Sequence, residues 1–190
     1  LSNSPSYNKN LLNTFGVPNT IFTVRVFYNR DLLREITGTE DHPVDFRQFV
    51  DLCRQIKTHA TAAGISISPL AGSRESSDHI FNRLFGSQTQ RLAMKLEPTN
   101  ELLTRHADIT VAYLADKWTL RDPEVLSGFG LIKLVGDFFT PGFQQLRRDD
   151  AVFQFTQEAA VMIVSGSYDS NSIKTQAPFD VGVFNIPMPK

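Results

Sequence analysis

The side chains best suited to chemistry in this sequence lie where a predicted strand ends. Gly166, Ser167 and Tyr168 follow the small apolar run 159–164, which is typical of a buried strand. Ligands of open α/β sheets bind at such strand ends, where backbone N–H groups and a ring can be presented to a cleft. An aromatic ring can also stack on the apolar face of a sugar. The three residues therefore predict a carbohydrate-type binding cleft rather than a catalytic site.

Tyr28 and Asn29 end an earlier predicted strand and are further candidate ligand contacts. Asn29 has two interpretations: it contacts the ligand, or it forms the turn and caps the helix that follows. Tyr168 also has two, because its ring either stacks on a sugar or only packs beneath a hinge. The sequence leaves both alternatives open.

Ser73, Arg74 and His79 belong to a third candidate segment, a predicted polar loop over 72–78 and the first residue of the helix expected after it. Their side chains are suitable hydrogen-bond partners for sugar hydroxyls. The alternative is a solvated loop with no ligand. Trp118, the single tryptophan, lies just before the helix opening at Asp122 and is interpreted as a packing residue.

No spacing in the sequence indicates catalysis or a metal site. It contains no Gly-x-Ser-x-Gly, P-loop or dinucleotide motif. The four histidines are far apart and lack metal-ligand spacing. The acidic pair Asp149-Asp150 has no second pair placed for glycoside hydrolysis. We therefore expect no enzyme activity, no cofactor and no metal.

Bulk composition narrows the class of partner. The chain has 190 residues, enough for one substantial domain, and a net charge of −1. Its basic residues are scattered, with only Arg147 and Arg148 adjacent, which argues against a nucleic-acid surface. The single cysteine, Cys53, excludes an internal disulfide and is expected in the core. No apolar run is long enough for a membrane span.

The elements that must position these residues alternate between short strands and longer helices. Asp45, with Gln48 three residues on, predicts a helix start, and Gly64 predicts its end. The other expected helices are 30–37, 79–85, a diffuse stretch over 88–117, one opening at Asp122-Pro123, and 144–157. The expected strands are 21–28, 65–69, 159–164 and one starting near 179. This pattern predicts an α/β fold with a small mixed sheet flanked by many helices.

Four segments in this order resemble the extracellular solute-binding proteins of family 1, the sugar-type binding components of ABC importers. They are Val-Phe-Tyr-Asn-Arg-Asp-Leu-Leu at 26–33, Pro-Val-Asp-Phe-Arg-Gln-Phe at 43–49, the stretch 149–168 ending in Gly-Ser-Tyr, and 179–189 ending in Pro-Met-Pro. The chain departs from the family pattern at 156–158, where Thr-Gln-Glu replaces a glycine-lysine turn. It departs again at Tyr168, where tryptophan is usual.

The resemblance implies one lobe of a periplasmic-binding-protein-like fold of type II. Residues 1–190 would form a single lobe, with a helical insertion at about 88–157, excised from a longer two-lobe protein. The implied function is capture of a sugar by hinge closure and delivery to ABC permease subunits. The protein would be a monomer in the periplasm or outside the cell, with membrane anchoring an option. The alternative is a ligand-sensing or interaction module of the same fold without transport.

Overall fold

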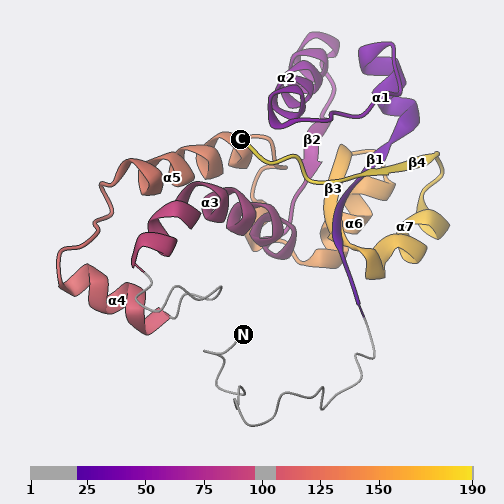
Figure 1. Ribbon diagram of the computed structural model, residues 1–190. Helices are drawn as coiled ribbons and strands as arrows, with labels where there is room; N and C mark the ends of the chain where they lie inside the picture. Colours follow the sequence, from indigo (N-terminus) through magenta and orange to yellow (C-terminus); the bar gives the residue numbers. More distant parts are fainter. Residues whose placement is uncertain (1–20, 97–105, 190) are drawn as a thin grey trace.

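A small four-stranded sheet forms the centre of the protein in the computed structural model, which describes residues 21–96 and 106–189 (Figure 1). The strands are β1 (Val24–Asn29), β2 (Ser68–Ala71), β3 (Ala160–Gly166) and β4 (Val181–Phe184), in the spatial order β2-β3-β1-β4. β3 runs parallel to β2 and antiparallel to β1, and β1 is antiparallel to β4. The predicted small mixed sheet in an α/β fold is confirmed.

The register of β1 and β3 sets the position of the candidate site. Val24 at the start of β1 pairs with Gly166 at the end of β3, and Tyr28 pairs with Met162. The end of β3 therefore lies beside the start of β1. Tyr28 and Asn29 are at the other end of β1, so they lie at the opposite end of the strands from Gly166.

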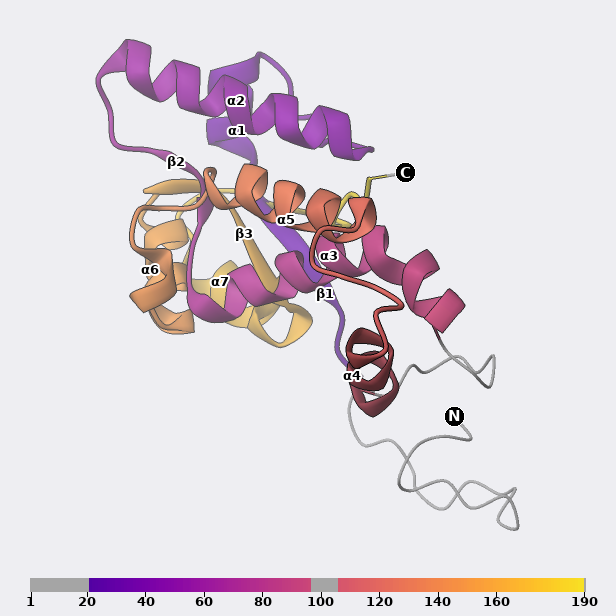
Figure 2. The ribbon, with the colours of Figure 1, turned by 90° about the vertical axis from the view of Figure 1, so that its left-hand side faces the viewer.

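Helices cover both faces of the sheet because side chains alternate along each buried strand. Val26 faces one apolar cluster with the helices α1, α2, α3 and α5, whereas Phe27 faces a second cluster with α6 and α7. Figures 1 and 2 show α1 and α2 well separated from α6 and α7. These helices are α1 (Arg30–Thr37), α2 (Phe46–Ala63), α3 (Arg74–Leu96), α5 (Pro123–Gly136), α6 (Arg148–Thr156) and α7 (Ser170–Gln176).

Helix α2 has the ends that its sequence predicts. The Asp45 side chain accepts a hydrogen bond of 2.8 Å from the Gln48 N–H, and Gly64 ends the helix in the left-handed conformation with a φ of 66°. The Gln48 side chain accepts from the Val44 N–H, one residue before the cap, at 3.0 Å. Cys53 lies fully buried on this helix, where burial raises the pKa of its thiol.

The segment 72–78 was predicted to be a loop, and this prediction is wrong. Helix α3 already begins at Arg74, because the Ser73 hydroxyl accepts a hydrogen bond of 3.1 Å from the Ser76 N–H and caps the first turn. A run of serines and charged residues is typical of a loop, but here it forms the first turn of a long helix. The two helical segments expected at 79–85 and from residue 88 onward are joined in one helix, α3, up to Leu96.

Three other boundaries differ from expectation. The strand predicted at 65–69 is β2 at Ser68–Ala71, whose last three residues are buried. Pro69 is tolerated there because β2 is an edge strand. The helix predicted over 144–157 is divided into a 3-10 turn, η1 (Phe143–Gln145), and α6. The diffuse region after α3 contains α4 (His106–Leu114). Within 21–96 and 106–189, no helix combines the length and the apolar character needed to cross a bilayer.

Candidate functional site

Tyr168 lies just past the end of β3, in the 3-10 turn η2 (Ser167–Asp169). Its side chain is 45% exposed. The hydroxyl donates a hydrogen bond of 2.8 Å to Glu75 Oε1 at the start of α3. Partial burial, and then the Glu75 carboxylate, raise the pKa of Tyr168 to about 12. The ring is therefore a neutral surface that solvent can reach, fixed at its hydroxyl end.

Gly166 supports this ring from below. A β-carbon at residue 166 would overlap the Tyr168 ring, so the ring can lie there only because residue 166 has no side chain. The edge of Phe22 approaches the ring as well, with 5.7 Å between the two centroids. The predicted Gly-Ser-aromatic strand end thus does present a ring at the edge of the sheet.

Arg148, the first residue of α6, is the second group at this ring. Its Cζ lies 5.7 Å from the Tyr168 centroid, a cation–π distance. Its Nη1 lies 3.7 Å from Oδ1 of Asp169, a buried carboxylate that also accepts a hydrogen bond from the Ser165 hydroxyl. Asp169, followed by Asp149, raises the pKa of Arg148 further above its ordinary range. The guanidinium is therefore a permanent charge held beside the ring.

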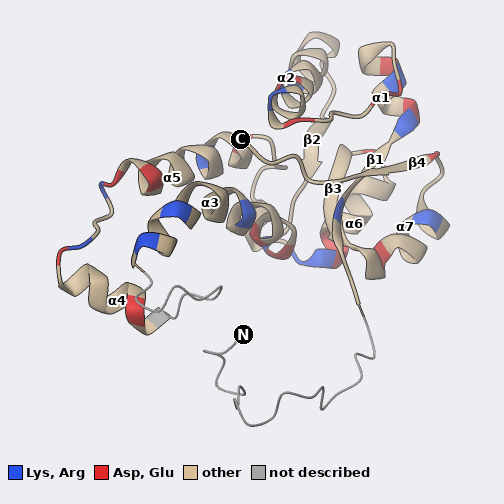
Figure 3. Cartoon of the chain, in the orientation of Figure 1, with Lys and Arg blue, Asp and Glu red and all other residues tan. Residues whose placement is uncertain are grey.

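A cavity of about 700 Å³ opens next to this group. Glu75 and Arg148, which both contact Tyr168, also line the cavity. Its walls come from the first turns of α3 and from the segment that runs from η1 to the first residue of α6. Figure 3 shows charged residues of both signs in this region. The lining residues are Arg74, Glu75, Asp78, His79, Asn82, Gln144, Gln145, Leu146, Arg147 and Arg148.

Two residues of the predicted site, Arg74 and His79, line this cavity. His79 Nε2 lies 3.8 Å from Glu75 Oε1, the same oxygen that accepts from Tyr168. Glu75 and His79 face the same side because they are four residues apart on α3. The structure thus brings Arg74, His79, Gly166 and Tyr168 into one region.

Ser73 and Ser167 are near this region but their groups are already bonded within the protein. Ser73 is fully buried and bonds to Ser76, so it caps α3 rather than facing the cavity. The Ser167 N–H was predicted to be available to a ligand, and this is wrong: it donates to the Thr23 carbonyl at 2.7 Å. The Ser167 hydroxyl accepts from the Thr23 N–H at 3.1 Å. Both serines hold the site in place.

Tyr28 and Asn29 do not join the cluster. Tyr28 is buried at the other end of β1, where its ring packs against Phe184 with 5.6 Å between centroids. Asn29 is fully buried; its Oδ1 accepts from the Leu32 N–H at 3.0 Å, and its Nδ2 donates to Glu158 at 3.2 Å. For Asn29 the structure shows the capping alternative.

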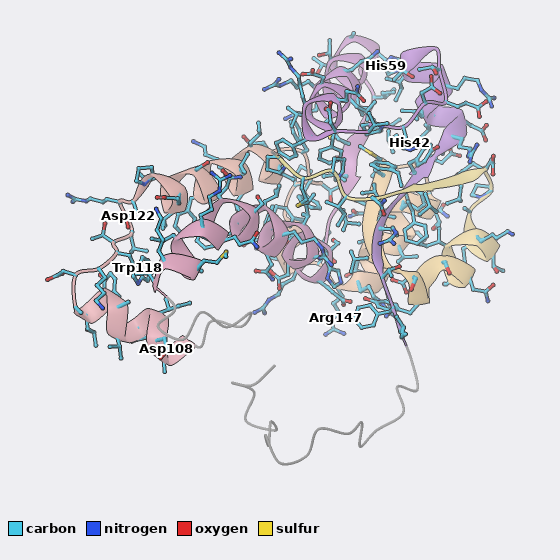
Figure 4. The ribbon with its side chains drawn as sticks, in the orientation of Figure 1. His42, His59, Asp108, Trp118, Asp122 and Arg147 are labelled. Carbon is cyan, nitrogen blue, oxygen red and sulfur yellow. The ribbon has the colours of Figure 1, made fainter. Side chains whose placement is uncertain are left out.

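Sequence reasoning missed several residues of the site: Glu75, Asn82, Gln144, Gln145, Arg147 and Arg148. A signal existed for Glu75 and Asn82, since with His79 they follow helical spacing on α3. That signal was hidden by the interpretation of 72–78 as a loop. The sequence identifies Arg147 and Arg148 only as adjacent basic residues. Figure 4 labels Arg147. Arg148 comes close to the Tyr168 ring only through the tertiary structure.

Trp118 lies away from this site, near α4 (Figure 4). Its indole N–H donates to the Ile109 carbonyl at 2.9 Å and its ring packs on Tyr113 with 5.2 Å between centroids. Trp118 therefore packs, as expected. The described part of the chain contains no group of three or more His, Cys, Asp and Glu side chains that could hold a metal ion.

Solved structures share this fold. One is described as a chitin oligosaccharide binding protein, with a TM-score of 0.65, 20% identity, and coverage of 89% of this chain and 39% of the other. The apo form of RafE from Streptococcus pneumoniae has a TM-score of 0.61, 18% identity, and coverage of 89% and 40%. A family 1 extracellular solute-binding protein from Bifidobacterium longum subsp. infantis has a TM-score of 0.58 and 16% identity, with coverage of 88% of this chain and 39% of the other.

The chain thus spans about two fifths of the length of these proteins. No protein-family model and no curated protein matches the sequence. Two of these structural neighbours are described as binding proteins. The protein has the fold of one part of a family 1 extracellular solute-binding protein.

Proposed function

We propose that this chain is the part of a solute receptor that holds one side of a carbohydrate. The observation that carries the proposal is the exposed ring of Tyr168, joined through Glu75 and Arg148 to a cavity of about 700 Å³. A ring beside a polar cavity matches the chemistry of a sugar, which has apolar C–H faces and a rim of hydroxyls. The chitin oligosaccharide binding protein of the same fold supports this choice of ligand class.

Each part of the site would have a separate task. The Tyr168 ring stacks on the apolar face of a sugar unit. The amide side chains of Asn82, Gln144 and Gln145, which line the cavity, can both donate to and accept from hydroxyls. Arg148, whose guanidinium lies over the Tyr168 ring, can donate hydrogen bonds to hydroxyls at the rim of the same sugar, and Glu75 keeps the tyrosine hydroxyl in place. Such a set fixes orientation without forming a covalent bond.

The wider protein would work by closure around the solute. The chain, as a single lobe over 1–190, supplies one wall, and a second lobe outside this chain supplies the other. The sugar contacts both and so favours the closed state. In the proposed setting the closed monomer delivers the sugar to ABC permease subunits outside the cytoplasm. One neighbour described as an extracellular solute-binding protein and another described as a probable secreted solute-binding lipoprotein support that location.

Isothermal titration of the intact two-lobe protein against a panel of neutral and charged oligosaccharides tests the proposal. We expect at least one sugar to bind, and Tyr168→Ala to reduce its affinity about tenfold or more, the scale of losing a stacked ring. Tyr113→Ala is the matched control, because Tyr113 is also 45% exposed but lies on α4. Flat heats for every sugar, or equal losses in both variants, would overturn the proposal.

A further inference from the structure

The charges of the cavity are not balanced. Three arginines line it, Arg74, Arg147 and Arg148, against two carboxylates, those of Glu75 and Asp78. Arg148 forms two ion pairs: its Nη2 lies 3.2 Å from Asp149 Oδ1, and its Nη1 lies 3.7 Å from Asp169 Oδ1. Arg74 and Arg147 form no ion pair with any carboxylate of the described residues within 4.0 Å. Two guanidinium groups of the cavity are therefore available to a ligand.

The backbone holds these two arginines near each other. The Arg74 N–H donates to the carbonyl of Leu146 at 3.2 Å, which ties the first residue of α3 to the residue before Arg147. The Arg147 N–H in turn donates to Asp150 Oδ2 at 2.8 Å and fixes the start of α6. Figure 4 labels Arg147 below the first turns of α3. Both side chains therefore reach the cavity from adjoining segments.

Arginine suits one class of ligand group in particular. Its planar guanidinium makes paired, charge-assisted hydrogen bonds to a carboxylate or a sulfate, and it stays charged at every physiological pH. A neutral sugar offers these arginines only uncharged hydroxyl acceptors, whose hydrogen bonds are weaker than those of a carboxylate or a sulfate. Asp78 lines the same cavity four residues after Arg74 on α3 and would repel an anion, so the anionic group must lie between Arg74 and Arg147, on the side of Arg74 away from Asp78. The other carboxylate of the cavity, Glu75, accepts a hydrogen bond from the Tyr168 hydroxyl.

We infer that the solute is an anionic carbohydrate, whose carboxylate or sulfate is bound by Arg74 and Arg147 while a sugar face stacks on Tyr168. The inference rests on the proposed function, since it assigns the ligand class of the same site. It assigns two separate roles within the site: the Tyr168 ring recognises the sugar face, and Arg74 and Arg147 recognise the negative charge.

The test compares trigalacturonate with its methyl ester, two trisaccharides that differ in charge and hardly in size. Calorimetry should show the acid binding about tenfold more tightly than the ester, equivalent to about 1.4 kcal/mol. The preference should vanish in the double variant Arg74→Gln, Arg147→Gln. It should persist in Arg91→Gln, an exposed arginine of α3 that does not line the cavity. Circular dichroism checks that all variants fold.

Two further arms separate the source of the charge. N-acetylglucosamine 6-sulfate against N-acetylglucosamine tests a sulfate in place of a carboxylate, and raising the salt to about 0.5 M should weaken whichever preference exists. Equal affinity for charged and neutral partners in both pairs would overturn the inference and leave the proposed function standing. Binding of no sugar of any charge would overturn both. A preference that survives in the double variant would assign the charge selection to other residues and so contradict the inference.

Discussion

The ring of Tyr168 occupies the space that a β-carbon of Gly166 would need. Residue 166 is thus a glycine for a steric reason that comes from two residues further along the chain. Its backbone is extended, with a φ of −75°, so no special conformation is required there. The pair converts the end of a buried strand into an exposed aromatic surface.

Gly166→Ala should therefore damage binding by moving the ring. The added methyl group forces Tyr168 away, and we expect a sugar affinity reduced about tenfold together with about 1–3 kcal/mol of lost stability from overpacking. Titration calorimetry and urea unfolding measure the two effects. Gly86→Ala is the control, because an added β-carbon there meets nothing within 4 Å. An unchanged affinity in Gly166→Ala would show that the ring position does not matter.

Glu75→Gln should lower the pKa of Tyr168. Burial is the largest cause of the rise to about 12, and the Glu75 carboxylate is the next; removing that charge makes the phenolate less unfavourable. The ¹³Cζ resonance of Tyr168 followed by NMR against pH gives the value directly. A pKa that stays the same or rises in Glu75→Gln would contradict the role assigned to this hydrogen bond.

The same shift has a defined effect on stability. A group whose pKa is raised on folding contributes stability that is complete below its unfolded value, about 10 for tyrosine, and that is lost as pH rises through the folded value. The Tyr168 contribution should thus fade between about pH 10 and 12. Comparing unfolding of the protein with that of Tyr168→Phe across this range isolates it, since phenylalanine does not titrate.

Asn29→Ala should reduce stability and leave sugar affinity unchanged. The variant loses the cap of α1 and the bond to Glu158, at a cost of about 1–2 kcal/mol. Urea unfolding measures the loss. Asn171→Ala, at an exposed position of α7, should stay within about 0.5 kcal/mol of the original protein. If the Asn29→Ala variant folds but binds sugar less tightly, Asn29 contributes to ligand binding and the capping role alone is wrong.

The emission of Trp118 should not respond to sugar. Trp118 bonds to Ile109 and packs beside Tyr113 near α4, on a part of the molecule away from Arg147 (Figure 4). A ligand at Tyr168 does not touch it. Fluorescence of the 190-residue chain, titrated with a sugar that calorimetry shows to bind, should therefore stay constant. Quenching or a spectral shift of Trp118 would place the sugar near α4.

Local signals in the sequence predict much of this fold. Asp45 and Gly64 delimit α2 because caps are determined by neighbouring residues. The small apolar run before Gly166 predicts β3, the most deeply buried strand. Segment 72–78 was misread because serine and charged residues are typical of loops and also of first helical turns, and only Ser73 as a cap distinguishes them.

The candidate site was predictable only in part, because most of its residues come together from distant parts of the sequence. Tyr168 follows directly from its place after a strand. Its partners Glu75 and Arg148 come from segments 93 and 20 residues away, and no local pattern relates them to it. Asn29 was a candidate because it also ends a strand, but β1 and β3 are antiparallel and their ends lie at opposite edges.

NMR of the Tyr168 ring during a sugar titration tests the central claim most directly. The protein is labelled with ¹³C in its tyrosine rings, and Tyr168→Phe assigns the resonance. We predict that a sugar that binds by calorimetry shifts the ring signals of Tyr168 in a saturable way, with smaller changes at Tyr28, which is buried at the other end of β1. A sugar that binds while the Tyr168 ring signals stay fixed would contradict the account.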